Sequence, residues 1–171
     1  MIPITFADTK RAHTRSMILD SSAFVARPDL LTALWHHAIS LDCADDRVLF
    51  RQGDNPSGLY FLHAGDATMT MQSDRGVQVV AAVMEPGSLL GLPAIVSDKP
   101  YSMTAVAKIG ATVGFVNRND FSAMMLSEPS LAMMILQVLA AEVRSTRMAF
   151  ANGEPSAHRG ISLRRKALIP A

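Results

Sequence analysis

Cysteine is nearly absent from this chain: Cys43 is the only one among 171 residues. A single cysteine excludes a disulfide within the chain and a cysteine-based zinc framework. Charged residues make up 18% and aromatic residues 6%, but hydrophobic residues reach 49%, which is a globular composition and not a disordered one.

The N-terminal "MIPITFADTKRAHTRS" lacks the apolar segment of a signal peptide. The most apolar window, residues 131–141, is too short to span a bilayer, so we expect a soluble protein in a reducing, cytoplasmic setting.

The charge is small and unevenly distributed. The net charge is +1, which argues against wholesale wrapping of nucleic acid. Residues 152–171 carry Arg159, Arg164, Arg165 and Lys166 against Glu154, or +3, and the remainder carries −2. We expect residues 152–171 to form a flexible basic tail. Such a tail is either a solvated end or a docking element for nucleic acid or a partner.

Hydrophobic periodicity predicts a helix, then many short strands, then two helices. Residues 21–39 have a helical pattern with Pro28 and Asp29 in a first turn. Short apolar runs separated by turn signals predict strands over 47–50, 58–64, 67–72, 77–84, 101–107 and 111–117. Strands of this length and spacing are typical of a sandwich, roll or barrel. Helical patterns return over 119–125 and 130–151. We therefore divide the chain into an N-terminal arm (1–20), one domain (21–151) and the tail.

The last predicted helix carries an apolar stripe formed by Leu131, Met134, Val138 and Ala141. The stripe and its neighbours are wide enough to contact both the roll and a second chain. We therefore predict a homodimer formed through this helix.

The middle of the chain resembles a known family. "VLFRQGDNPSGLYFLHAGDATM" (residues 48–69) resembles the start of the roll in cyclic nucleotide-binding domains, the sensor domains of catabolite-activator-type regulators. "EPGSLLG" (85–91) resembles the entry to that family's phosphate-binding cassette, and "YSMTAVA" (101–107) resembles the strand that closes it. The resemblance implies an α+β, mainly β fold: an antiparallel double-stranded β-roll, jelly-roll-like and cupin-like. It also implies an N-terminal helix, a short cassette helix and a long C-terminal helix.

By this resemblance the cassette forms the ligand pocket. In the family, backbone N–H groups and an arginine hold the cyclic phosphate, and a carboxylate holds the ribose. This chain has Gly91-Leu92 where the family has Gly-Glu, and Tyr101-Ser102-Met103 where the family has Arg-Ser-Ala. We expect Leu92, Tyr101 and Met103 to make the pocket apolar, with hydroxyl edges from Tyr101, Ser102 and Thr104. The candidate pocket residues are Gly87, Ser88, Leu89, Leu90, Gly91, Leu92, Pro93, Ala94, Tyr101, Ser102, Met103 and Thr104.

Several functions remain open from the sequence. The pocket is vestigial in a structural interaction protein, or it takes a ligand other than a cyclic nucleotide, or it binds cyclic nucleotides through backbone and hydroxyl groups. Residues 152–171 show no helix-turn-helix pattern, so we expect no sequence-specific DNA binding unless another chain supplies the DNA-binding part. No nucleophile elbow, P-loop or metal motif is present, and we predict neither enzymatic activity nor a bound cofactor or metal. Our main hypothesis is a non-enzymatic regulatory module that signals through its long helix.

Overall fold

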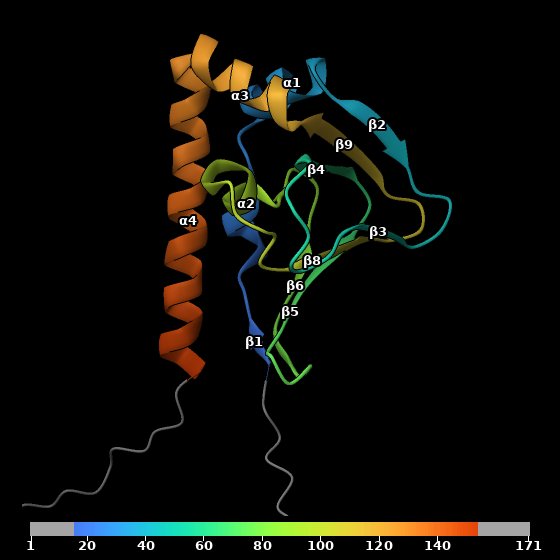
Figure 1. Cartoon of the computed structure of the whole chain (residues 1–171), viewed down its shortest axis with the longest axis vertical. Helices are drawn as coiled ribbons and strands as arrows, with labels where there is room; N and C mark the ends of the chain where they lie inside the picture. The colour runs from blue at the N-terminus through green and yellow to red at the C-terminus, as the bar shows by residue number, and fades with distance from the viewer. Residues whose placement is uncertain (1–15, 154–171) are drawn as a thin grey trace, which may run out of the picture.

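The computed structural model describes residues 16–153, which form a β-roll of two sheets with a long helix along one side (Figure 1). The five-stranded sheet has the order β1-β6-β5-β8-β3, and the four-stranded sheet has the order β2-β9-β4-β7. Most strand pairs are antiparallel, and β1 pairs with β6 in parallel. The predictions for the basic tail fall almost wholly outside the described residues, as does most of the N-terminal arm.

The elements of the five-stranded sheet are β1 (Met17–Ile18), β3 (Arg47–Phe50), β5 (Ala67–Gln72), β6 (Gln78–Met84) and β8 (Thr104–Ala107). The four-stranded sheet contains β2 (Ile39–Asp42), β4 (Gly58–Ala64), β7 (Leu89–Leu90) and β9 (Thr112–Asn117). The helices are η1 (Ser21–Phe24), α1 (Pro28–His36), α2 (Leu92–Ser97), α3 (Arg118–Ser127) and α4 (Pro129–Gly153).

Two hydrophobic clusters hold these elements together. The first fills the roll, where the alternation of β5 places Ala67 and Met69 inward, 0% and 5% exposed. The second lies where the four-stranded sheet meets the helices, and it includes Leu92 of α2 and Leu131 of α4. Packing in this second cluster fixes α4 against its own domain. The domain is therefore of the expected α+β, mainly β class, with its helices on the outside of the roll.

The structure corrects several predicted boundaries. The pattern over 21–39 is not one helix: a 3₁₀ turn, η1, precedes α1, and β2 begins at Ile39. The strand predicted over 101–107 begins only at Thr104, because the chain before it is irregular. The folded domain also begins before residue 21, since Met17 and Ile18 pair with β6 and Leu19 is buried. Strands as short as β1 and β7, two residues each, leave no readable alternation in the sequence.

The apolar stripe predicted as a dimer contact faces inward in part. Leu131 and Val138 are 5% and 7% exposed, and both belong to the second cluster of their own domain. Met134 is also packed against that cluster, and Ala141 is half-buried. The prediction that two copies meet through Leu131 and Val138 is therefore wrong, because the roll already covers these side chains.

No single helix within residues 16–153 is long and apolar enough to cross a membrane. Helices α3 and α4 meet the length and composition requirement only together, and they bend by 115° where they meet.

Candidate ligand cavity

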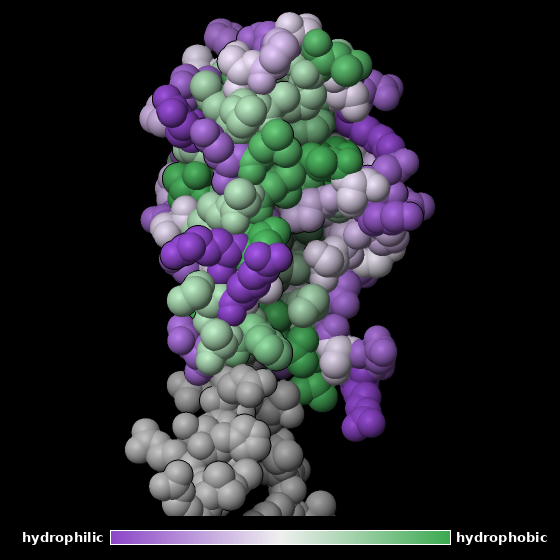
Figure 2. Space-filling model, turned by 90° about the vertical axis from the view of Figure 1, so that its left-hand side faces the viewer, coloured by the Kyte–Doolittle hydropathy of each residue, from purple (hydrophilic) through white to green (hydrophobic). Residues whose placement is uncertain are grey.

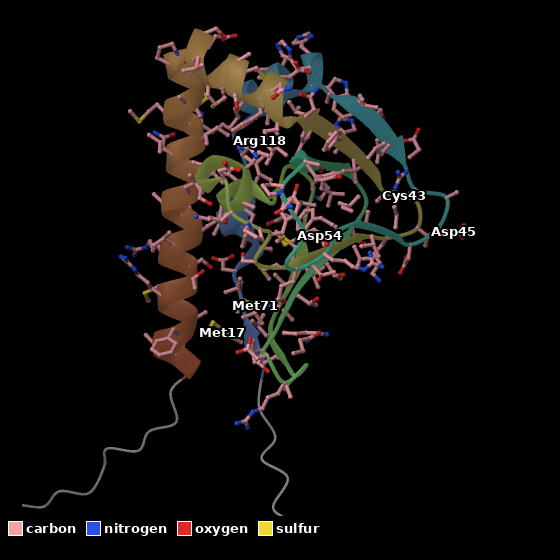
Figure 3. All side chains as sticks on the ribbon, in the orientation of Figure 1. Met17, Cys43, Asp45, Asp54, Met71 and Arg118 are labelled. Carbon is pink, nitrogen blue, oxygen red and sulfur yellow. The ribbon has the colours of Figure 1, made fainter. Side chains whose placement is uncertain are left out.

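A cavity of about 400 Å³ lies between the roll and the inner side of α4. That volume is in the range of small-molecule sites. Figure 3 labels Met71 on β5, on the side of the sheet that faces α4. The walls come from the segment around β1 and η1, from β3, β5 and β6, from the cassette and from α4. The lining residues are Leu19, Phe24, Phe50, Met69, Met71, Val80, Leu89, Gly91, Pro93, Ala94, Tyr101, Ser102, Met103, Glu142, Val143, Thr146 and Arg147.

Tyr101 is fixed by its backbone as well as its side chain. Its carbonyl accepts a hydrogen bond from Gly53 N (2.8 Å), and its N–H donates to Asp54 O (2.9 Å). Asp54, labelled in Figure 3, accepts the Arg51 N–H at 2.9 Å and so closes this turn. The Gly-Asp turn singled out in the sequence therefore holds the residue that stands in place of the family's arginine.

The side chain of Tyr101 points into the protein and is 3% exposed. Its ring stacks on Phe50 with 3.9 Å between centroids and 14° between planes. Its hydroxyl donates to Gly58 O at 2.8 Å. The expected free hydroxyl edge from Tyr101 is therefore wrong, because that hydroxyl already has a backbone partner. What Tyr101 offers the cavity is aromatic surface.

Gly91 allows the cassette to approach Tyr101 closely. The residue has φ of 84°, in the left-handed region, and caps the N-terminus of α2. A Cβ at this position would lie 2.6 Å from Cε1 of Tyr101, which is too close for any side chain. The turn that would hold a phosphate in the family is thus packed under an aromatic ring in this chain.

The structure brings seven of the twelve predicted pocket residues to the cavity wall: Leu89, Gly91, Pro93, Ala94, Tyr101, Ser102 and Met103. The other five lie elsewhere: Gly87, Ser88, Leu90, Leu92 and Thr104.

The structure places four of these five residues in other surroundings. Leu92 is fully buried in the second cluster, so the expectation that it lines the pocket is wrong. Leu90 lies in the first cluster. The Thr104 hydroxyl accepts the Gln52 N–H at 3.0 Å, which removes another expected hydroxyl edge. Ser88 is fully buried, and its Oγ has no hydrogen-bond partner.

Helix α4 supplies the polar part of the cavity wall, which the sequence analysis missed. Glu142 is 8% exposed, and its Oε1 has no hydrogen-bond partner. Burial raises the pKa of the Glu142 carboxyl from 4.5 to about 8. Thr146 donates its hydroxyl to Glu142 O on the helix backbone (2.9 Å). The spacing Leu131, Ile135, Val138, Glu142 could have indicated this position, because it continues the buried face by one turn.

The structure also bears on the histidines and Cys43. Within residues 16–153, no three His, Cys, Asp or Glu side chains come together as a metal site would require. His63 stacks on Trp35 with 4.4 Å between ring centroids, and Cys43 is buried. Over the described part of the chain, the cavity wall holds one carboxyl and no histidine or cysteine. Its chemistry is that of binding through apolar contact and a few polar groups.

Residues 42–128 match the profile of the family described as the cyclic nucleotide-binding domain. Over 119 residues the chain is 28% identical to human patatin-like phospholipase domain-containing protein 6. The match covers 68% of this chain but 8% of that protein. The catabolite activator protein of Thermus thermophilus superposes with a TM-score of 0.65 at 21% identity, over 74% of this chain and 59% of its own. The sensor domain of the transcriptional regulator DNR from Pseudomonas aeruginosa superposes with a TM-score of 0.54 at 19% identity. This match covers 78% of this chain and 86% of that domain's chain.

These matches agree with the geometry. The solved structures share the fold, and the human protein is matched over only a small part of its length. The family profile runs from the last residue of β2 to the end of α3 and includes the cassette and Tyr101. This chain therefore belongs to the cyclic nucleotide-binding domain family.

Proposed function

We propose that this chain is a regulatory module, not an enzyme, which binds a small molecule other than cyclic AMP or cyclic GMP. The observation that carries the proposal is that α4 forms one wall of the cavity. A ligand there would contact the roll and the long helix at once, so binding could change how α4 packs. The description of the DNR domain as the sensor of a transcriptional regulator supports a sensing role for this fold.

The charges around the cavity argue against cyclic nucleotides. A cyclic phosphate needs a counter-charge, and the cassette offers Tyr101 in place of the family's arginine. The ionic side chains on the wall come from α4: the buried Glu142 and the exposed Arg147. The Glu142 carboxyl, whether protonated or ionised, supplies no counter-charge for a phosphate.

The same helix offers a surface for a second copy. On its outer side, Met133, Leu136, Val143 and Phe150 are 57%, 54%, 48% and 61% exposed. With Ala140 and Arg147 they follow alternating steps of three and four, the spacing of a two-helix seam. Figure 2 shows apolar surface along this face, interrupted by hydrophilic residues. We propose a homodimer through this outer seam, which adjoins the cavity because Val143 and Arg147 also lie on the cavity wall.

Sequence-specific DNA binding is not part of the proposed function. The net charge of +1 gives little attraction to DNA, and the basic cluster of residues 152–171 shows no helical pattern. We expect any binding to be weak and to fade as salt is raised. A gel shift that prefers one sequence at physiological salt would contradict this.

Ligand identification from the native host tests the proposed function. The protein is purified from its own organism, and native mass spectrometry measures what remains bound. We expect one small molecule per chain, different from cyclic AMP and cyclic GMP. Ser102→Trp should reduce that occupancy, because Ser102 is an exposed residue on the cavity wall and the indole would fill the space. A chain that carries no ligand, or carries a cyclic nucleotide, would contradict the proposal.

A further inference from the structure

Glu142 is unusual among the polar groups of the cavity because it is buried and unpartnered. Within residues 16–153, only the Ser88 hydroxyl and Glu142 Oε1 are buried side-chain oxygens without a hydrogen-bond partner. Ser88 lies outside the cavity, whereas Glu142 is on its wall. An unpaired buried carboxyl is costly, and native structures rarely keep one without a role. The cavity therefore contains a group to which a ligand can bond.

The surroundings of Glu142 are mainly apolar. Apart from Glu142, the wall offers three aromatic rings, three methionines and several aliphatic side chains. Of the hydroxyls on the wall, Thr146 is bonded to the helix backbone, Tyr101 is bonded to Gly58, and Ser102 is exposed to solvent. A ligand that fits must bring an apolar or aromatic body and place one hydrogen-bonding group at the carboxyl.

The charged or titratable groups near Glu142 are few. Arg147 on α4 and Tyr101 before β8 share the cavity wall. No ion pair joins Arg147 to Glu142 among the described residues. Asp20 precedes η1, which packs against α4, and it lines a neighbouring groove together with Arg144. Neither η1 nor β1 contributes an ionisable side chain of its own. Within residues 16–153 no cation of the protein pairs with Glu142, so a ligand can supply the missing positive charge.

We propose that the cavity binds a small molecule with an apolar or aromatic body and a cationic amine, and that the amine pairs with the Glu142 carboxylate. This inference rests on the proposed function, because it names the ligand class of the same cavity. A cationic amine satisfies the carboxylate in both charge and hydrogen bonding, whereas an alcohol satisfies hydrogen bonding alone and a carboxylate ligand repels it.

Calorimetry with three probes of one shape tests the inference. Tryptamine, tryptophol and indole-3-acetate share the indole body and differ in the terminal group. We expect tryptamine to bind the wild type about 10- to 100-fold more tightly than tryptophol, with indole-3-acetate weakest. Glu142→Gln should remove the preference for the amine and leave tryptophol within about twofold. Glu128→Gln, the same exchange at an exposed position, should change nothing.

Proton release gives a second readout that a merely structural glutamate would not produce. The pKa of about 8 leaves the free Glu142 carboxyl largely protonated at pH 7, and pairing with a cation would ionise it. Titrations in buffers of different ionisation enthalpy should then show most of one proton released per tryptamine bound. The release should vanish in Glu142→Gln and above pH 9.

The outcomes separate the inference from the proposed function. Equal binding of the three probes, or an amine preference that survives Glu142→Gln, would overturn the inference. If tryptophol still binds and Ser102→Trp prevents it, the cavity remains a ligand site with another specificity. If no probe binds, the inference is overturned; if the host-purified protein is also empty, the proposed function fails as well.

Discussion

Glu142 couples the stability of this domain to pH. The carboxyl has a pKa of about 8 when folded, against 4.5 unperturbed, so the folded chain holds a proton that the unfolded chain releases. Below about pH 4.5 the carboxyl is protonated in both the folded and the unfolded chain, and its burial costs no stability through ionisation. As the pH rises from there toward 8, the free energy of unfolding decreases.

We expect Glu142→Gln to remove this loss. Relative to the wild type, the variant should gain free energy of unfolding steadily between about pH 5 and pH 8. The gain should level off above that range at about 3–5 kcal/mol. Urea unfolding at several pH values measures it, with Glu128→Gln as the exposed control. A pH-independent difference between Glu142→Gln and the wild type would show that Glu142 ionises normally in the folded chain.

At the scale of the element, α2 presents two different faces. Leu92 is fully buried in the second cluster, whereas Val96 on the same helix is 48% exposed. Restoring the family's glutamate at position 92 would thus put a carboxylate into a hydrophobic cluster and would not equip the cavity. Leu92→Glu should destabilise the domain by at least about 3 kcal/mol, and Val96→Glu should stay within about 0.5 kcal/mol. Thermal unfolding of both variants measures the difference, and a stable Leu92→Glu would mean that α2 can turn this face outward.

Helix α4 also has two faces, of which the outer one is proposed to hold a second copy. Leu136→Glu should raise the dimer dissociation constant by at least about 100-fold, because each copy would bury a carboxylate in the seam. Leu126→Glu is the matched control, since Leu126 on α3 is 86% exposed and lies outside the seam. Sedimentation equilibrium measures both. A wild-type chain that stays monomeric at high micromolar concentration, or a Leu136→Glu dimer, would contradict the seam.

At the scale of the molecule, the sequence predicted the roll well because its strands carry strong local signals. The runs over 47–50, 58–64 and 67–72 coincide with β3, β4 and β5, and Gly53-Asp54 marks the turn that holds Tyr101. Leu92 was misplaced and Glu142 was missed for the same reason. Which face of a helix is buried depends on the tertiary surface that packs against it. The local sequence does not show which surface that is. The resemblance placed Leu92 in the pocket by its neighbours in the chain, and the structure turns it the other way.

The clearest test concerns the ligand that the family name implies. An Arg–phosphate hydrogen bond of the charged kind contributes about 1.5–3 kcal/mol, and this chain lacks both the arginine and the carboxylate of the cassette. The measurement is a calorimetric titration of the wild-type chain with cyclic AMP and with cyclic GMP at pH 7. We predict dissociation constants of about 0.1–10 mM for either nucleotide, a loss of roughly 10²–10⁴ from binding at about 1 μM. A micromolar constant for either one would contradict the proposal that this cavity senses a different molecule.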